Sequence, residues 1–371
     1  MTPVELSRTV LRAVRRAVEA GELSVDVPAR AVVAPPGPGG RGDYATNIAL
    51  QLARPAGQPP LRVAEVLRSY LAASEGVARV EITGPGFLNL SLDGSAAAVL
   101  VRRVLGEGPR YGHDDRLAGR VFAVRVPYEI RAEVVADALA RIVAAQGGRV
   151  DVSHDGPVTL RPAPAPEDPA ALGLDAARWA LLHPAPHDRP RVTADHLVQR
   201  ESNPVFRVRY AHARTRAVRR NAADLGFGAW SGSVPHDALS AAVTDAATDA
   251  VMESVAESVT DVVAADFGLH VPAEAHELLS LLADYPRILA TAVTDVAQPG
   301  TPGLDVGAPS RLARHLLALA DVTLVLLPVV LPRGEEKPSA AHRARLALAE
   351  AAGAVLAGGL SLLGIDAPDH L

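Results

Sequence analysis

One stretch decides the fold of the C-terminal half of the chain: Asn203-Pro204-Val205-Phe206-Arg207-Val208-Arg209-Tyr210-Ala211-His212-Ala213-Arg214. From here the apolar residues recur with the period of an amphipathic helix as far as Ala223. The same period returns in four later segments: His236–Ala265, Ala273–Val296, Pro309–Leu327 and Ser339–Leu363. We therefore expect residues 201–371 to form an all-α helical bundle.

The segment upstream of this stretch, residues 120–200, predicts a small α/β part. An apolar strand at Val121–Val126 is followed by a helix at Ile130–Ala145, and a second strand at Arg149–Val152 follows two glycines. This order is one βαβ unit. Two proline-rich joints and one short helix complete the part: Pro157–Pro169, Pro184–Pro190 and Asp175–Leu182.

The first part, residues 1–108, predicts an α+β module. Apolar residues alternate on both sides of Gly84-Pro85-Gly86, which is typical of two strands joined by a tight turn. Proline costs little in the first turn of a helix, because the N–H that it lacks has no partner there. The other expected elements are an amphipathic helix to Ala20, a strand at Arg30–Ala34, and helices at Tyr44–Ala53 and Val63–Ala73.

The composition fits a folded protein of two or three domains. Of 371 residues, 49% are hydrophobic and 21% are charged, and no long polar tract indicates a disordered arm. Cysteine is absent, which excludes a disulfide framework, a thiolate metal site and a cysteine nucleophile. The net charge of −5 gives no global attraction to phosphate, so any nucleic-acid contact must come from local arginine clusters.

We expect a cytoplasmic protein with no membrane partner. Met1–Ala20 has arginines between its apolar residues and lacks the apolar core of a signal peptide. The most apolar run, Val322–Leu331, is shorter than the roughly 20 residues that cross a bilayer, and Pro328 interrupts it.

Several motifs resemble those of arginyl-tRNA synthetases. Two of them, Gly42–Leu50 and Gly84–Leu90, resemble the signatures of that family's N-terminal domain. Others are similar to its DALR-type anticodon-binding domain: Asn203–Phe206, Tyr210–Arg214, Arg311–Arg314, Arg345–Leu348 and the ending Val355–Pro368. The resemblance implies an N-terminal domain at residues 1–108, a truncated remnant of a Rossmann-like α/β catalytic domain at 120–200, and an anticodon-binding helical domain at 201–371.

The resemblance also implies tRNA contacts in the first part. In the family, an aromatic ring and an amide of the second signature meet an extruded base at the tRNA elbow, and the matching positions are Phe87 and Asn89. Stacking and hydrogen bonding are the means by which proteins bind unstacked bases. Tyr44 and Asn47 would flank this surface. The alternative is that Phe87 fills a core and Asn89 ties down a turn.

In the third part, the resemblance gives Tyr210, Arg214, Arg311 and Arg314 as RNA-binding candidates. Tyr210 and Arg214 are four positions apart and can share one helix face, which His212 cannot share with them. The alternative is that Tyr210 packs inward and Arg214 forms a local ion pair. Further arginines on this stretch suit phosphate binding or form a solvated face: Arg207, Arg209, Arg216, Arg219 and Arg220.

The catalytic signatures of the family are missing, so the resemblance implies no catalytic residue and no cofactor. Aligning Ala136–Arg141 with the matching family helix places Val126–Glu129 on the His-x-Gly-His signature, and both histidines are absent. A glutamate there would repel a triphosphate, whose reactions depend on electrostatic stabilisation. The second signature, Lys-Met-Ser-Lys-Ser, needs lysines on a mobile loop, and Lys337 is the only lysine in the chain.

A metal site is not expected either. His183 and His187 have the spacing of a metal-binding pair, but Pro184 and Pro186 exclude a helix between them. No third ligand is evident besides Asp188.

Two functions from different classes remain open. The first is a noncatalytic tRNA-binding protein, with arginine tRNA as the first candidate and no DNA binding expected, and the paired end domains favour it. The second is an interaction or regulatory module that binds a protein partner such as a full-length synthetase. The apolar run Val322–Leu331 and the negative net charge favour the second function. An active arginine ligase is the least favoured interpretation.

Overall fold

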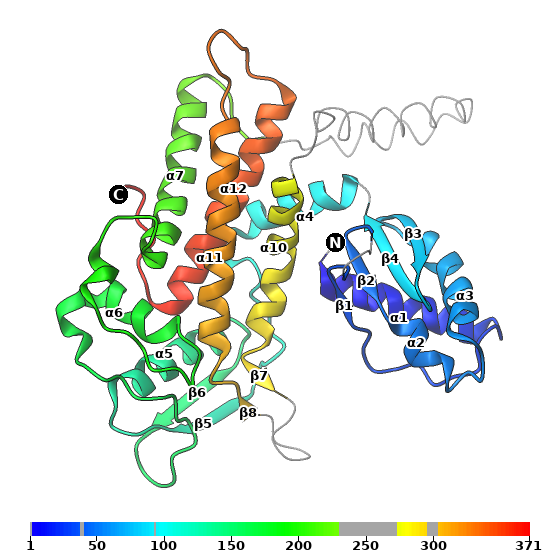
Figure 1. Ribbon diagram of the computed structural model, residues 1–371, viewed down its shortest axis with the longest axis horizontal. Coiled ribbons are helices and arrows are strands. Elements are labelled where there is room, and N and C mark those ends of the chain that lie inside the picture. Colours follow the sequence, from blue (N-terminus) through cyan, green and yellow to red (C-terminus); the bar gives the residue numbers. More distant parts are fainter. Residues whose placement is uncertain (1, 38–40, 93, 230–272, 295–302) are drawn as a thin grey trace. The chain divides into compact units, whose positions relative to one another are not determined.

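A computed structural model describes residues 2–37, 41–92, 94–229, 273–294 and 303–371 (Figure 1). These residues divide into two compact units: unit 1 lies within Met1–Arg102, and unit 2 comprises the described residues from Arg103 to Leu371. The second and third parts expected from the sequence therefore pack together as one unit. The helix expected at His236–Ala265 lies outside the described residues.

Unit 1 is an antiparallel sheet with helices packed on one face. Along each strand the side chains alternate between the two faces, and Leu88 and Leu90 belong to the core that the helices cover. The sheet has the order β1-β2-β4-β3, with strands β1 (Val33–Ala34), β2 (Tyr44–Thr46), β3 (Val77–Thr83) and β4 (Phe87–Leu92). The helices are α1 (Pro3–Glu19), α2 (Ile48–Ala53) and α3 (Pro60–Ala72). The expected α+β class of this region is confirmed.

One element of unit 1 differs from the expectation, because Tyr44–Thr46 is a strand and not the start of a helix. Tyr44 pairs with Leu90 and Thr46 with Leu88, which puts both side chains on the core face. Thr46 Oγ1 accepts a hydrogen bond from the backbone N–H of Ile48 at 3.3 Å, where α2 begins. Pairing with β4, a strand distant in sequence, outweighs the local helical pattern.

Unit 2 joins a small parallel sheet to a helical bundle. Strands β5 (Val121–Arg125) and β6 (Arg149–Ser153) are parallel and are connected by α5 (Ile130–Ala144), which is the expected βαβ unit. Helix α11 packs against α7, α10 and α12 at the centre of the bundle (Figure 1). The long helices are α7 (Pro204–Asp224), α10 (Ala273–Ala290), α11 (Ala308–Leu326) and α12 (Ala340–Leu363).

Shorter elements complete the described chain. Helix α6 (Gly173–Leu182) packs against α5, and α4 (Gly94–Glu107) spans the boundary between the two units. A small antiparallel pair, β7 (Val293–Thr294) and β8 (Gly303–Leu304), follows α10 and was not part of the all-α expectation. Four 3-10 turns are η1 (Gly108–Arg110), η2 (Pro169–Leu172), η3 (Ala194–Leu197) and η4 (Leu327–Val329).

The apolar run at the end of α11 is core and not an unpaired surface, which corrects the expectation. Val322 is 8% exposed, Leu326 is 2% exposed and Val330 is fully buried, whereas Val325 is 59% exposed. Two segments are long and apolar enough to cross a membrane, whereas the sequence predicted none: Ala308–Val329 and Ala341–Leu363. In the most apolar window of each, 56% and 78% of the residues are buried inside the protein. Such burial is expected of helices at the centre of a bundle.

Helix α12 approaches its neighbours closely through glycines. A Cβ at Gly358 would overlap the backbone carbonyl of Pro109 in η1, and a Cβ at Gly359 would overlap the side chain of Leu316 on α11. The Leu316 side chain can shift, but a backbone carbonyl cannot rotate away. Gly358 is therefore the position where the packing has least tolerance.

We expect Gly358→Ala to lower the free energy of unfolding of unit 2 by about 2 kcal/mol, because overpacking a close interface typically costs about 1–3 kcal/mol. Urea unfolding followed by Trp179 fluorescence in a Trp230→Phe background measures the change. Gly106→Ala is the matched control, since Gly106 also lies in a helix but has nothing within 4 Å of a Cβ. A Gly358→Ala protein as stable as its parent would contradict the close contact.

Candidate functional site

The first candidate surface is the sheet face of unit 1 opposite its helices, which we call the sheet surface. Phe87 and Asn89 of β4 lie on this face and pair with Thr83 and Glu81 of β3. Phe87 is 40% exposed, so part of its ring is free to stack on a planar ligand. Phe87 therefore does not fill the core, and the position agrees with a stacking role.

The turn before Phe87 is anchored to α3. Gly86 has a φ of 138°, and a Cβ at this residue would lie 3.0 Å from the carbonyl oxygen of Pro60. Both the left-handed backbone and the close approach require glycine. The glycine thus determines where β4 begins and where the Phe87 ring emerges.

Asn89 is buried, contrary to the expectation of an amide exposed to a base. Its side chain is 3% exposed, and its Nδ2 donates a hydrogen bond to Thr83 Oγ1 at 2.7 Å. The burial is possible because the hydrogen bond satisfies the amide. Asn89 therefore ties β4 to the end of β3, beside the turn that carries Phe87.

Tyr44 and Asn47, the two residues expected to flank the sheet surface, differ in their exposure. Tyr44 is 4% exposed and belongs to the core, so its expected place on the surface is wrong. Asn47 is half-buried before α2, and its Oδ1 accepts a hydrogen bond from Gln51 Nε2 at 3.1 Å. Of the four residues proposed for the elbow, Phe87 is the one with a freely exposed ring.

The second candidate surface is a stripe along α7 that comprises Phe206, Tyr210 and Arg214, which we call the α7 stripe. The rings of Phe206 and Tyr210 are stacked with centroids 5.4 Å apart, and Arg214 Cζ lies 6.0 Å from the Tyr210 centroid. Tyr210 is 37% exposed and Arg214 is exposed. Their shared face was expected from the spacing, and Tyr210 does not pack inward. A ring with a cation beside it suits an anionic polymer that carries planar bases.

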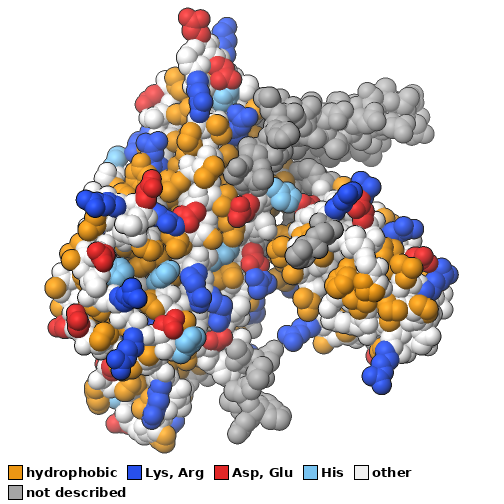
Figure 2. All heavy atoms as spheres, viewed as in Figure 1, with side chains coloured by type: hydrophobic (Ala, Val, Ile, Leu, Met, Phe, Trp, Pro, Cys, Tyr) orange, Lys and Arg blue, Asp and Glu red, His pale blue; other side chains and the backbone are white. Residues whose placement is uncertain are grey.

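The other arginines of α7 hold acidic or polar side chains from elsewhere in unit 2. Of the six arginines on this helix, Arg214 and Arg220 have no acidic partner in the described part of the chain, and Arg220 contacts a histidine. The pairs are Arg207–Asp321 at 2.5 Å, Arg209–Asp175 at 3.5 Å, Arg216–Asp369 at 2.8 Å, Arg219–Glu350 at 3.8 Å, and Arg220 with His370 Nδ1 at 3.3 Å. These arginines are therefore not a free basic face. Figure 2 likewise shows basic side chains interspersed with acidic ones over the helical unit.

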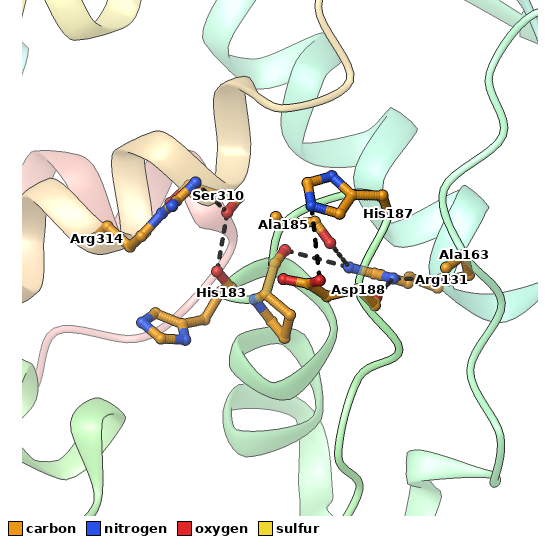
Figure 3. A network of polar contacts seen from close by, with 9 residues as sticks. Arg131, Ala163, His183, Ala185, His187, Asp188, Ser310 and Arg314 are labelled. Atoms are coloured by element: carbon orange, nitrogen blue, oxygen red, sulfur yellow. Dashed lines mark hydrogen bonds and ion pairs between the residues drawn. The ribbon is translucent and has the colours of Figure 1, made fainter.

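The two arginine candidates of α11 differ in how free they are. Arg311 is held by Thr291 and by Asp305, whose Oδ2 accepts from Arg311 Nη2 at 2.8 Å. Arg314 is exposed, and Ser310 Oγ accepts from its Nη2 at 3.1 Å while donating to the carbonyl of His183 at 2.9 Å (Figure 3). Burial, together with Arg314 nearby, lowers the pKa of His183. Both arginines line a hollow of about 580 Å³ beside His187.

Among the described residues no cluster of three or more metal-ligating side chains is found. His187 lies 3.6 Å from Asp188 and its side chain is 83% exposed (Figure 3). His183 instead stacks on Trp179, with ring centroids 5.3 Å apart. The two histidines therefore do not converge on one point.

Two protein-family models match this chain. Residues 5–92 match the arginyl tRNA synthetase N terminal domain, and residues 244–371 match the DALR anticodon binding domain. The first range contains the sheet surface, and the described part of the second contains α10, α11 and α12. The α7 stripe lies outside both ranges. The chain thus carries a match to a synthetase N-terminal domain and a match to an anticodon-binding domain.

Curated relatives match part of the chain. The arginine–tRNA ligase of Renibacterium salmoninarum is 45% identical over 163 residues, which is 40% of this chain and 30% of that protein. The ligase of Frankia alni is 42% identical over 161 residues, 40% of this chain and 28% of that protein. This chain thus spans about 30% of the length of these curated relatives. The arginyl-tRNA synthetase of Thermus thermophilus has a similar fold, with a TM-score of 0.63 and 14% identity over 100% of both chains.

The position that the sequence aligns with the first catalytic signature of arginyl-tRNA synthetases is a helix cap. One carboxylate oxygen of Glu129 accepts from Ala132 N at 2.9 Å, and the other accepts from Ala165 N at 2.9 Å. Helix N-termini bind anions because their N–H groups have no internal partner. Here the side chain of Glu129 is that anion. Tyr128 is 84% exposed and stacks on His154, with ring centroids 4.2 Å apart.

Arg131, in the first turn of α5, was not singled out from the sequence and is the most connected side chain of the remnant. It is 1% exposed and points toward the two proline-rich joints, Pro157–Pro169 and Pro184–Pro190 (Figure 3). We call residues 161–191, which contain parts of both joints and α6, the proline-rich segment. Its guanidinium donates to five backbone carbonyls: Ala163, Leu181, Pro184, Ala185 and Asp188. The sequence did contain an indication, because Arg131 has helical spacing with the apolar residues Val135 and Leu139.

Proposed function

We propose that this chain is a noncatalytic tRNA-binding protein of the arginyl-tRNA synthetase family that acts in the cytoplasm, with arginine tRNA as the first candidate. One observation carries the proposal: each unit presents an exposed aromatic ring, Phe87 or Tyr210, at a position where the family resemblance implies a base contact. Exposed rings bind unstacked bases through stacking. The matches to a synthetase N-terminal domain and to an anticodon-binding domain support the same partner.

Loss of aminoacylation is the second element of the proposal. The triphosphate of ATP would approach the α5 N-terminus, where the Glu129 carboxylate already accepts two backbone N–H groups. A half-buried carboxylate with a charge of the same sign disfavours triphosphate binding. Arginine-dependent pyrophosphate exchange should therefore be absent from the purified protein, and measurable exchange would refute this element.

We expect Phe87→Ala and Tyr210→Ala each to weaken tRNA binding about tenfold, because stacking one base on an aromatic ring contributes about 1–3 kcal/mol. Fluorescence anisotropy with labelled arginine tRNA measures the dissociation constant. A tRNA of different specificity and a single-stranded DNA of equal length test selectivity. Tyr128→Ala is the matched control, since Tyr128 is an exposed ring that belongs to neither surface. Equal affinity of the parent for tRNA and DNA would refute the proposal.

A protein partner remains the second candidate function. Its original support, the apolar run at the end of α11, is lost because that run is buried. A different observation favours it: Leu174, Leu197 and Val198 are 66%, 53% and 37% exposed around one hollow of about 280 Å³. Exposed apolar residues that gather at one place are typical of interfaces. Titration calorimetry with a purified full-length arginyl-tRNA synthetase, using Leu174→Asp as the variant, tests this candidate.

A further inference from the structure

The chain after α12 lies along α7. We call Gly364–Leu371 the C-terminal segment. The Nδ1 atom of His212, on α7, donates to the carbonyl oxygen of Pro368 at 3.0 Å. At the next residue of the segment, the Nε atom of Arg216 donates to Asp369 Oδ1 at 2.8 Å. Arg220 Nη2, one turn later on α7, donates to His370 Nδ1 at 3.3 Å. Successive residues of the segment thus occupy successive turns of one helix.

The start of this segment is held firmly. Arg178 donates to the carbonyl of Gly364, and Arg141 Nη1 donates to the carbonyl of Leu362 at 3.3 Å. The backbone N–H of Asp366 donates to Asp175 Oδ1 at 3.2 Å. These contacts join the segment to α5 and α6 and hold it at the head of α7.

The end of the segment is held by exposed contacts. The side chain of Asp369 is 54% exposed and that of Arg216 is 39% exposed. Arg216 lowers the pKa of Asp369, so this carboxylate is charged at neutral pH. Water and salt screen an ion pair of this kind, which makes it easy to exchange.

The carboxylates that pair with other arginines of α7 are harder for a phosphate to replace. Asp321 lies on α11 and Glu350 on α12, and both helices pack against α7 in the bundle. Asp369 lies on a segment without helix or strand. Arg209 contacts Asp366 of the segment at 3.9 Å, but it also pairs with Asp175 on α6 at 3.5 Å. Arg216 is therefore the arginine of α7 whose described acidic partner lies on the segment alone. Arg216 is four positions from His212 and from Arg220, so these three residues share a face of α7 that is separate from the α7 stripe.

We propose that the C-terminal segment is an internal competitor for RNA, in which the Asp369 carboxylate occupies Arg216 until an RNA phosphate displaces it. Arg216 and Arg220 are then phosphate contacts on the face of α7 that the segment covers, in addition to the α7 stripe. Displacement costs the protein its own ion pair, so the segment lowers RNA affinity and leaves the contact surface intact. This inference rests on the proposed tRNA binding and adds its regulation.

The first test removes the competing charge. Asp369→Asn should bind labelled tRNA about threefold to tenfold more tightly than the parent at low salt, and the gain should shrink as salt rises. Asp151→Asn is the matched control: it changes the net charge equally, and Asp151 also forms an exposed pair, with Arg149 at 2.7 Å. Arg216→Gln should weaken binding, and Asp369→Asn should have no further effect in that background. Such non-additivity identifies Arg216 as the group for which the carboxylate competes.

The second test follows the segment directly. The chain contains no cysteine, so Leu371→Cys offers a single site for an environment-sensitive fluorophore. Adding tRNA should change its emission with the same dissociation constant as the anisotropy titration. If the parent binds tRNA, but the emission of the label does not change and Asp369→Asn binds with the parent's dissociation constant, the competitor is refuted while the proposed function stands. If neither the parent nor Asp369→Asn binds tRNA, both proposals fail. Binding by Asp369→Asn alone would support the competitor.

Discussion

Replacing Arg131 with methionine should lower the free energy of unfolding of unit 2 by about 3–5 kcal/mol, since the change removes the one side chain that donates to all five carbonyls of this network. A buried ion pair can be exchanged for apolar side chains without loss when both partners are replaced. Both partners cannot be replaced at Arg131, because its hydrogen-bond partners are five backbone carbonyls between residues 163 and 188. The carbonyls remain after the substitution and lose their donors.

Arg131→Lys tests the geometry of this network separately from its charge. An ammonium offers three donors without the planar fork of a guanidinium, so it cannot serve five carbonyls that converge from different directions. We expect the lysine variant to lose about half as much stability as the methionine variant. Urea unfolding in the Trp230→Phe background follows the buried Trp179, which lies in α6 within the proline-rich segment.

The control for both variants is Arg149→Met. Arg149 also lies in the βαβ unit, but its side chain is 71% exposed and holds one exposed carboxylate. We expect a change within about 0.5 kcal/mol there. Limited proteolysis gives a second measurement, because release of the proline-rich segment in the Arg131 variants should create cleavage sites at residues 161–191. Unchanged unfolding and unchanged cleavage would show that the segment does not depend on Arg131.

Arg131 also explains how the βαβ remnant folds with only two strands. A two-stranded sheet buries too little apolar surface to be stable alone. This βαβ unit is supported instead by the proline-rich segment, which Arg131 binds to the first turn of α5. It is also supported by α6 and α12, which pack against α5. The same segment places Ala165 N on Glu129. The stability of this part and the position of the Glu129 carboxylate at α5 therefore have one structural cause.

The sequence predicted most helices because their apolar faces repeat with a regular period. The expected Pro204–Ala223, Pro309–Leu327 and Ser339–Leu363 correspond to α7, α11 and α12 within two residues. It failed at Tyr44, where pairing with β4 converts an expected helix start into a strand. The local sequence pattern does not reveal that this segment pairs with β4, which lies more than 40 residues away in the chain.

The candidate site was predicted less completely than the fold. Helical spacing was sufficient to place Tyr210 and Arg214 on one face, since both lie on the same helix. The burial of Asn89 depends on a hydrogen bond to Thr83, and a sequence does not reveal which polar side chains satisfy one another. The pairing of Arg216 with Asp369 is beyond prediction for the same reason, because 153 positions separate the two residues.

Acidification should destabilise unit 2 through His315, which lies on α11 and is 7% exposed. Burial lowers the pKa of His315 to about 4 from an ordinary value of 6.5. Asp284 and a hydrogen bond that the ring donates to the backbone of Leu281 favour the charged form, but they do not offset burial, and Arg287 opposes them. The ring packs against Tyr285, with centroids 6.0 Å apart, and its Nε2 has no hydrogen-bond partner.

The direction of the pH effect follows from the lowered pKa. Between pH 6.5 and pH 4 the unfolded chain binds a proton at His315 that the folded chain does not bind, so stability is complete above this range and falls through it. The loss should be about 2 kcal/mol by pH 5 and about 3 kcal/mol by pH 4. Urea unfolding at pH 7.5, 6.0 and 5.0 measures it.

A variant isolates this histidine from the other groups that titrate. His183 and His212 also have pKa values lowered by burial, so the parent should lose more stability than His315 alone accounts for. His315→Gln removes one titrating group, and we expect its loss between pH 7.5 and pH 5 to be about 2 kcal/mol smaller than that of the parent. His187→Gln, at an exposed side chain, should keep the parent's slope. Equal slopes for the parent and His315→Gln would mean that the folded protein protonates His315 as readily as the unfolded chain does.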